Sequence, residues 1–140
     1  MKIMVVDDDP DVIFVLKRIL KKYGCEVVGI TDSKKCLAMV KKKMPDLLFL
    51  DVMMPDINGW EICRKIKEDP KTSDIFVSML TVKCEGGDRK KSLEYARADR
   101  HLCKPINFEK IEKIVEGIGS SQTRLKINPQ FTSCNSPQCS

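Results

Sequence analysis

The feature that most constrains the fold is a short apolar run, residues 47–50 (Leu-Leu-Phe-Leu), that ends in Asp51. Four apolar residues without polar alternation are typical of a central strand in a parallel sheet, which is covered on both faces. Turn-forming residues bound the run at positions 45–46 and 54–59. Asp51 is therefore expected at the carboxyl end of a buried strand, where open α/β sheets carry their chemistry. We interpret it as the reactive group.

The rest of the chain alternates strand and helix patterns. Strands are predicted at residues 3–6, 26–30, 47–50, 75–80 and 99–103. One helix is predicted from Asp9 and Pro10 to a stop at Gly24, and a second ends before Pro45. The others are predicted from residue 60 to about 69, from 86–87 to about 96 as a polar helix that packs lightly or faces a partner, and from 107 to 118. This order predicts an α/β fold, a doubly wound five-stranded parallel sheet with five helices on both faces.

The chain length of 140 residues fits one domain. From Gly119 onward the periodicity ends, acidic residues are absent, and Ser, Asn, Gln and Pro dominate. We expect residues 1–118 to form the domain and residues 119–140 to be a flexible C-terminal tail with no domain of its own. Since the domain would be followed only by this tail, it is expected to act as a stand-alone module.

Cysteine usage and the N-terminus point to one compartment. No apolar run approaches membrane-spanning length, and Met1 leads directly into a strand-like segment without a signal-peptide pattern. The seven cysteines are odd in number and form no Cys-x-x-Cys pair. We interpret five of them as reduced core residues of a cytoplasmic protein: Cys25, Cys36, Cys63, Cys84 and Cys103. For Cys134 and Cys139, in the tail, a metal or disulfide role stays open.

The net charge of +5 is mild, and its lysine clusters at residues 41–43 and 89–91 are interpreted as solvated helix faces. A basic stripe interleaved with aromatics, which nucleic-acid binding would favour, is missing from the sequence. We therefore expect no direct nucleic-acid partner and no membrane partner.

Chemically active side chains follow four of the five predicted strands. They are Asp7 and Asp8 after the first, Asp51 after the third, Thr81 after the fourth and Lys104 after the fifth. In a parallel sheet these positions share one edge. Clustered carboxylates repel one another or demand a cation, and oxygen-only ligands favour Mg²⁺. An ammonium and a hydroxyl nearby suit a phosphoryl group, for which a carboxylate can be the nucleophile.

Taken singly, each of these residues also has an ordinary structural explanation. Asp7 and Asp8 are possible helix caps, Thr81 a strand-end hydroxyl and Lys104 a solvated cation. Their joint occurrence at the matching strand ends is what favours a functional site.

These segments resemble the response-regulator receiver domain of two-component signalling. The resemblance rests on residues 5–10 (VVDDDP), 45–55 (PDLLFLDVMMP), 79–81 (MLT) and 104–105 (KP), and it extends from residue 1 to about 118. It implies the flavodoxin-like receiver fold with strand order 2-1-3-4-5 and a cis peptide bond between Lys104 and Pro105.

The resemblance also implies roles for the site residues. Asp51 resembles the phospho-acceptor, with Thr81 and Lys104 completing the catalytic set. Asp8 resembles the direct Mg²⁺ ligand and Asp7 an assisting one that acts mainly through water. Asp51 itself and the backbone carbonyl of Met53 complete the implied metal set.

The implied function is a phosphorylation-activated signalling switch in a phosphorelay. Asp51 would accept the phosphoryl group from a phosphohistidine of a histidine kinase or phosphotransfer protein. The switch pair would be Thr81 and the residue at position 101. On phosphorylation Thr81 would turn toward the phosphoryl group, and the side chain at position 101 would pack inward into the space it leaves. Output would pass to a downstream protein through the fourth helix, fifth strand and fifth helix. The chain would catalyse only its own phosphorylation and dephosphorylation, not a turnover reaction. It would act as a monomer or a phosphorylation-dependent dimer.

One departure stands out at the switch position, which usually holds Tyr or Phe in the family and here is His101. Because imidazole is smaller and titrates near neutral pH, weaker or pH-sensitive output coupling is expected.

Three alternative functions would need different residues or would lack the phosphorylation step. A phosphatase of the haloacid dehalogenase type needs a second Asp two residues after its nucleophile, where Met53 stands. A flavodoxin needs a hydroxyl- and Gly-rich loop after the first strand, where residues 7–9 are acidic. The third alternative is a pseudo-receiver that binds proteins without being phosphorylated. The intact set of Asp8, Asp51, Thr81 and Lys104 argues against it.

Overall fold

The structure is a computed structural model that describes residues 1–127, and it divides into two units, Met1–Ile106 and the residues from Asn107 onward. The first unit holds all strands and four helices. Its strands are β1 (Lys2–Val6), β2 (Glu26–Ile30), β3 (Leu47–Leu50), β4 (Phe76–Thr81) and β5 (Arg100–Cys103). Its helices are α1 (Pro10–Lys21), α2 (Cys36–Lys43), α3 (Gly59–Glu68) and α4 (Asp88–Lys90), with a 3₁₀ turn η1 (Ser33–Lys35) before α2 and a π-helix η2 (Lys91–Tyr95) after α4. The second unit contains α5 (Phe108–Ile127).

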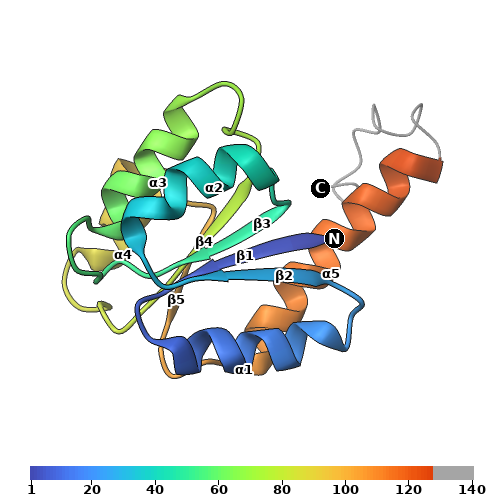
Figure 1. The fold of residues 1–140 in the computed structure, drawn as a ribbon, viewed down its shortest axis with the longest axis horizontal. Coiled ribbons are helices and arrows are strands. Elements are labelled where there is room, and N and C mark those ends of the chain that lie inside the picture. Colours follow the sequence, from blue (N-terminus) through green and yellow to red (C-terminus); the bar gives the residue numbers. More distant parts are fainter. Residues whose placement is uncertain (128–140) are drawn as a thin grey trace. The chain divides into compact units, whose positions relative to one another are not determined.

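The sheet is parallel throughout, in the order β2-β1-β3-β4-β5 (Figure 1). This confirms the predicted fold class and strand order. The register aligns the strand ends, since Val6 pairs with Ile30 on one side and Leu50 on the other, and Thr81 pairs with Cys103. Residues that directly follow the strands therefore gather along one edge of the sheet.

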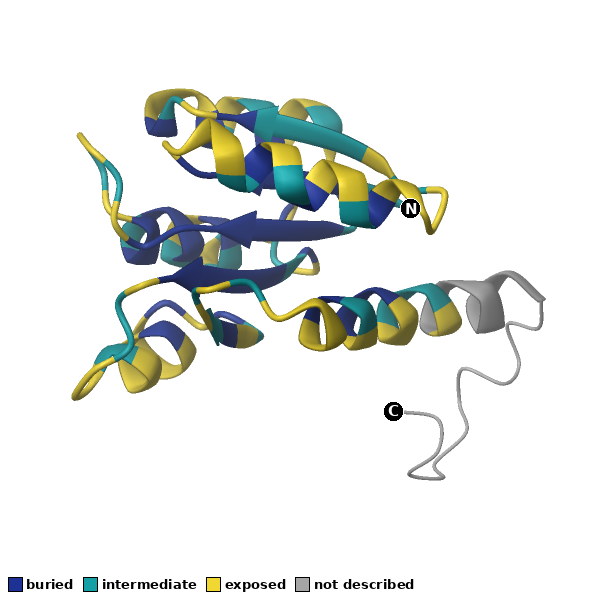
Figure 2. Ribbon diagram, turned by 90° about the horizontal axis from the view of Figure 1, so that it is seen from below, coloured by how far each residue is buried: buried dark blue, intermediate teal, exposed yellow. Residues whose placement is uncertain are grey.

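The sheet is covered on both faces within the first unit. Helix α1 lies against one face, and α2 and α3 lie against the other (Figure 1). All four residues of β3 are buried, as Figure 2 shows for the central strands. Burying an apolar side chain of this size contributes about 1.5–3 kcal/mol to stability, so β3 anchors the core on which Asp51 is mounted.

Two helix starts follow from capping side chains. Asp9 caps α1, where its carboxylate accepts the backbone N–H of Asp11 at 2.9 Å and Pro10 is the first helical residue. This confirms the predicted start. Asn58 caps α3 by accepting the N–H of Glu61 at 3.0 Å. Both caps fix helices that begin close to the strand ends.

The fourth helix differs from its prediction. It is α-helical only over Asp88–Lys90 and then widens into η2, where the N–H of Ala96 bonds the carbonyl of Lys91 at 3.0 Å. Ser92 and, directly after η2, Ala96 are buried, while Leu93 and Tyr95 are each 38% exposed. The helix therefore packs lightly, and a partner for it stays a prediction. We attribute the π-helix to Ser92, whose buried hydroxyl has two tertiary partners described below.

Helix α5 runs to Ile127, so the helix end expected near residue 118 is wrong. Gly119 and the serines after it do not end the helix, because glycine and serine lower helix propensity without forbidding the conformation. The division between domain and tail stays a prediction. Cys134 and Cys139 lie outside the described residues.

The interpretation of the cysteines holds in part. Cys36 and Cys63 are fully buried and free, and Cys25 is free and half-buried. Cys84 and Cys103 form a disulfide, so the prediction of reduced thiols is wrong for this pair. The reason is the β4–β5 register, which leaves the Cα atoms of Cys84 and Cys103 6.0 Å apart, within the range that a disulfide spans.

Two further findings bear on the predictions. The Lys104–Pro105 peptide bond is cis, as the resemblance implied. Within residues 1–127, no helix combines the length and apolar character needed to cross a membrane.

Candidate functional site

The backbone places three charged side chains at one edge of the sheet. Asp7, Asp51 and Lys104 are each the first residue after a strand, and each backbone N–H extends the sheet by one hydrogen bond. Asp7 donates to Ile30 at 3.1 Å, Asp51 to Val6 at 3.1 Å, and Lys104 to Thr81 at 2.8 Å. The side chains are therefore positioned by the sheet itself rather than by free loops.

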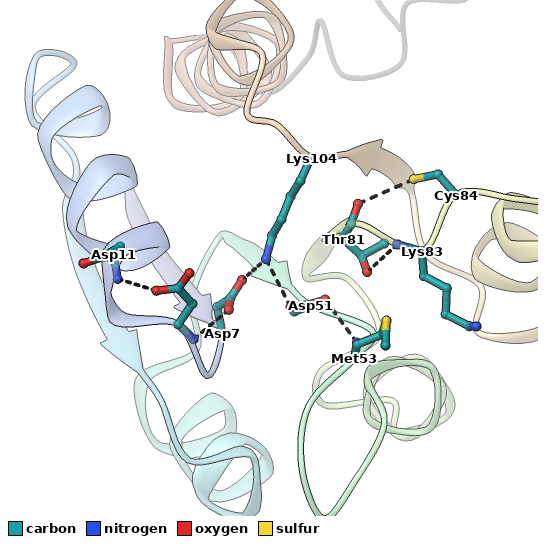
Figure 3. A network of polar contacts seen from close by, with 9 residues as sticks. Asp7, Asp11, Asp51, Met53, Thr81, Lys83, Cys84 and Lys104 are labelled. Atoms are coloured by element: carbon teal, nitrogen blue, oxygen red, sulfur yellow. Dashed lines mark hydrogen bonds and ion pairs between the residues drawn. The ribbon is translucent and has the colours of Figure 1, made fainter.

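Lys104 joins the two buried carboxylates of this edge. Its Nζ lies 2.7 Å from Oδ2 of Asp7 and 3.2 Å from Oδ2 of Asp51 (Figure 3). The side chains of Asp7 and Asp51 are 3% and 7% exposed, and that of Lys104 is 16% exposed. One ammonium thus balances two nearly buried carboxylates.

The titration of this group reflects the same geometry. Burial raises the pKa of Asp7 above 3.8, and its hydrogen bond with Lys104 opposes that rise. Burial alone would lower the pKa of Lys104, but its bonds to Asp7 and Asp51 outweigh burial and raise that pKa above 10.5. Lys104 is therefore a permanent cation at this edge.

Asp8 adds a third carboxylate, which is exposed. Oxygen atoms of Asp7, Asp8 and Asp51 lie within 4.8 Å of one another. Three carboxylates against one lysine leave the cluster net negative. An all-oxygen set open to solvent on one side fits a hard divalent cation such as Mg²⁺, which binds through few carboxylates and keeps waters.

The backbone after Asp51 is held by α3. The N–H of Met53 donates to Oδ1 of Asp51 at 3.1 Å, and the N–H of Gly59 donates to the carbonyl of Val52 at 2.8 Å. A Cβ atom at Gly59 would overlap the backbone carbonyl of Asp51. The sequence indicated Gly59 only as a turn residue, so its role in packing α3 against the Asp51 backbone was missed.

Thr81 is fully buried at the end of β4. Its Oγ1 accepts the N–H of Lys83 at 3.1 Å, so the hydroxyl is engaged by the loop that follows the strand (Figure 3). Among residues 1–120, no hydrogen bond joins this hydroxyl to Asp51.

His101 is buried, with 2% of its surface exposed. Its Nδ1 lies 2.6 Å from Oγ of Ser92, and its Nε2 lies 3.3 Å from Sγ of Cys84. The same Ser92 hydroxyl accepts the indole N–H of Trp60 at 2.9 Å. The ring thus already occupies an inward position, whereas the prediction had it move inward on phosphorylation. Ser92 and Trp60 were missed because only tertiary packing brings them to β5.

The structure brings together Asp7, Asp8, Asp51 and Lys104 as predicted. It places Thr81 and His101 beside the loop after β4, with the Thr81 hydroxyl turned to that loop. The assignment of the Met53 carbonyl as a ligand stays a prediction.

Comparison with known proteins decides the family. The family model of the response regulator receiver domain matches residues 3–116. The chain belongs to this receiver domain family. Receiver domains are signalling modules of two-component systems, not turnover enzymes.

Individual relatives agree with this assignment. Over 106 residues the chain is 40% identical to "Response regulator PleD" of Caulobacter vibrioides, which covers 76% of this chain and 23% of PleD. Over 117 residues it is 32% identical to the "Alkaline phosphatase synthesis transcriptional regulatory protein PhoP" of Bacillus subtilis, covering 84% of this chain and 48% of PhoP. The chain thus spans about a quarter to a half of these relatives.

Solved structures share the fold over nearly their whole length. The "BeF3 Activated DrrB Receiver Domain" has a TM-score of 0.76 at 31% identity and covers 85% of this chain and 97% of its own. The Vibrio cholerae chemotaxis protein CheY4 has a TM-score of 0.74 at 26% identity and covers 84% of this chain and 97% of its own.

Proposed function

We propose that this receiver domain is a phosphorylation-activated switch whose phospho-acceptor is Asp51. The observation that supports it most strongly is Lys104 bridging Asp51 and Asp7 at the carboxyl edge of the sheet, with Asp8 beside them. The donor is proposed to be a phosphohistidine of a histidine kinase or phosphotransfer protein.

The metal proposed for this site is Mg²⁺. Asp8 would hold it directly, Asp7 mainly through water, and Asp51 and the carbonyl of Met53 would complete the protein ligands. When bound, Mg²⁺ neutralises charge on the phosphoryl oxygens. The donor set suits Mg²⁺ because it consists only of oxygen atoms and carries more negative charge than Lys104 can balance.

The chemistry proposed for the side chains is a single displacement. A carboxylate oxygen of Asp51 attacks the phosphorus in line, the P–N bond of the phosphohistidine breaks, and the imidazole leaves with the bonding pair. Lys104, already within 3.2 Å of Asp51, neutralises the product. Thr81 exchanges its bond with the N–H of Lys83 for a bond to a phosphoryl oxygen.

The signal is a shift between two conformations of the loop after β4. The phosphoryl group favours one conformation because it makes contacts there, to Thr81 and Lys104, that the other conformation lacks. Because His101 is already buried and bound to Ser92, the shift would act on those hydrogen bonds rather than on an inward swing of the ring.

Output is proposed to reach a downstream protein through side chains of α4, β5 and α5, from a monomer or a phosphorylation-dependent dimer in the cytoplasm. We further propose that the domain makes no direct contact with nucleic acid or with a membrane.

The test is intact-protein mass spectrometry after incubation with acetyl phosphate and Mg²⁺. The wild type should gain one phosphoryl group, and chelation of the metal should prevent the gain. Asp51→Asn should gain none. Asp56→Asn is the matched control, because Asp56 is an exposed carboxylate in the following loop and its positive φ suits Asn. An unmodified wild type under all these conditions would favour the pseudo-receiver, a binding module that acts without phosphorylation.

A further inference from the structure

A pair of cysteines meets beside the switch residues. The disulfide joins Cys84, in the loop after β4, to Cys103, the last residue of β5. Cys103 is also the register partner of Thr81, and Sγ of Cys84 lies 3.5 Å from the Thr81 carbonyl oxygen (Figure 3). The bond therefore fastens the loop that follows Thr81 to the neighbouring strand.

This pair differs from Cys36 and Cys63 in its access to solvent. Cys36 and Cys63 are fully buried, and burial raises the pKa of each thiol to about 12. Neither Cys84 nor Cys103 is buried. Exchange reactions need an accessible thiolate, so a small thiol or disulfide can reach this pair. Cys25 is also half-buried, but it is a free cysteine and not part of a pair.

The imidazole of His101 lies beside the pair. Its Nε2 lies 3.3 Å from Sγ of Cys84, and its Nδ1 is held by Ser92. Burial, with the charge of Arg89, lowers the pKa of His101 against the opposing effects of Asp88 and the Lys83 backbone. The ring is therefore neutral near pH 7, and its Nε2 faces the Cys84 sulfur. Because of this contact we assign Cys84 as the attacking thiol and Cys103 as the resolving one.

We propose that Cys84 and Cys103 are a reversible redox modification site that restrains the receiver switch. The Cys84 thiolate attacks one sulfur of a low-molecular-weight disulfide, forms a mixed disulfide and releases one thiolate. The Cys103 thiolate then attacks the Cys84 sulfur and releases the second thiolate. The two cysteine protons end on the two released thiols, so the cysteines are oxidised and the small disulfide is reduced.

The effect on switching rests on the function proposed above. Only two residues separate Thr81 from Cys84, and the Thr81 hydroxyl is bound to the N–H of one of them, Lys83. To reach a phosphoryl group on Asp51, this hydroxyl must leave that bond while Cys84 is tethered to β5. The disulfide therefore disfavours the phosphorylated conformation. By reciprocity, phosphorylation should favour the dithiol.

The redox site itself is tested without phosphate. The full chain is equilibrated in buffers of varied reduced-to-oxidised glutathione ratio, acid-quenched and alkylated, and the labelled peptides are measured by mass spectrometry. Cys84 and Cys103 should lose label together as the buffer becomes oxidising and regain it on reduction. In Cys84→Ser, Cys103 should instead carry glutathione or label. Asp51→Asn should behave like the wild type, which separates this result from any failure of the phosphorylation proposal.

Two outcomes would overturn the redox site. One is that Cys84 and Cys103 are alkylated at every glutathione ratio, or that either of them forms a disulfide with another cysteine of the chain. The other is protection that requires added Zn²⁺ and disappears with a chelator, without loss of two hydrogen atoms from the protein. That result would make Cys84, His101 and Cys103 a metal site, which their mutual distances of under 4.8 Å also permit.

The coupling is tested by the rate of acetyl phosphate labelling at Asp51. The labelling rate of the oxidised wild type should be lower than that of the reduced protein by a factor of about five or more. Effects of this size are typical of coupling between two sites in one protein. The double variant Cys84→Ser, Cys103→Ser should be labelled at one rate in both buffers. Equal rates for oxidised and reduced wild type would overturn the restraint while leaving the redox site and the phosphorylation proposal standing.

Discussion

Lys104 is the residue on which the charge balance of the site depends. It contacts Asp7 and Asp51 directly, and both carboxylates are nearly buried. Without it, two desolvated carboxylates would face each other and Asp8. Among the described residues, Asp7 and Asp51 form no other ion pair. A buried charge that loses its partner lowers the stability of the fold by more free energy than the ion pair itself contributes.

Substituting Lys104→Met should lower the free energy of unfolding by about 2 kcal/mol near pH 7 in the absence of divalent cations. Urea denaturation followed by the fluorescence of Trp60, the single tryptophan, measures this. Added Mg²⁺ should recover part of the loss. Lys42→Met, at an exposed helix position, is the control and should change little. Equal stability of Lys104→Met and wild type without metal would contradict the proposed charge balance.

His101, the single histidine, gives a second prediction at this scale. Burial lowers its pKa below 6.5, so the folded state binds fewer protons at that site than the unfolded state. The free energy of unfolding should therefore fall as pH decreases below 6.5 and level off below the folded pKa. The raised pKa of Asp7 acts in the opposite direction, and it is common to wild type and variant.

The measurement is urea denaturation of wild type and His101→Gln from pH 5 to pH 8, read as the difference between the two proteins. That difference should shrink as pH falls, because only the wild type has to keep a buried imidazole neutral. A difference independent of pH would show that His101 titrates alike in the folded and unfolded states.

Among the elements, α3 is the one on which the position of Asp51, the proposed phospho-acceptor, depends most. Asn58 starts this helix, and Gly59 brings its first turn against the backbone of Asp51 and Val52. No side chain larger than hydrogen fits at position 59 unless the backbone moves. The start of α3 and the end of β3 that carries Asp51 are therefore packed directly against each other.

Gly59→Ala should lower the free energy of unfolding by about 2–4 kcal/mol, because the added Cβ meets backbone atoms rather than a flexible side chain. The same substitution should slow labelling by acetyl phosphate, because Asp51 shifts with its carbonyl. Gly87→Ala is the matched control, since a Cβ there meets no atom within 4 Å. If both variants unfold at the same urea concentration as wild type, the close approach of α3 to Asp51 is wrong.

Elements with strong local signals could be predicted from the sequence. The apolar run of β3, the Asp-Pro start of α1 and the alternation of strands with helices all act within a few residues of the chain. The π-helix after α4 and the continuation of α5 past residue 118 could not be predicted. The residues there have weak helix propensities, and these are overridden by tertiary contacts at α4 and by the preceding helix at α5. Ser92 illustrates this, since its partners Trp60 and His101 lie on α3 and β5.

The same division holds for the site across the whole molecule. Asp7, Asp8, Asp51 and Lys104 could be predicted because a parallel sheet brings its strand ends together. The disulfide could not, because Cys84 and Cys103 are 19 residues apart and meet only through the β4–β5 register. The engagement of the Thr81 hydroxyl by its own loop likewise depends on a turn that residue types do not specify.

The metal should stabilise the whole molecule by binding only the folded state. At a Mg²⁺ concentration ten times its Kd, the free energy of unfolding should rise by about 1.4 kcal/mol. Asp8→Asn should remove most of this gain, while the loop control Asp56→Asn should keep it. Urea denaturation with and without Mg²⁺ gives the comparison. A gain that persists in Asp8→Asn would place the cation elsewhere.

The most direct test of the central claim is to locate the phosphoryl group in the chain. The protein is incubated with acetyl phosphate and Mg²⁺, then treated with borohydride, which reduces an aspartyl phosphate to homoserine, and its peptides are sequenced by tandem mass spectrometry. The proposed mechanism predicts homoserine at position 51 and at no other aspartate. Homoserine at Asp7 or Asp8, or at no position, would contradict it.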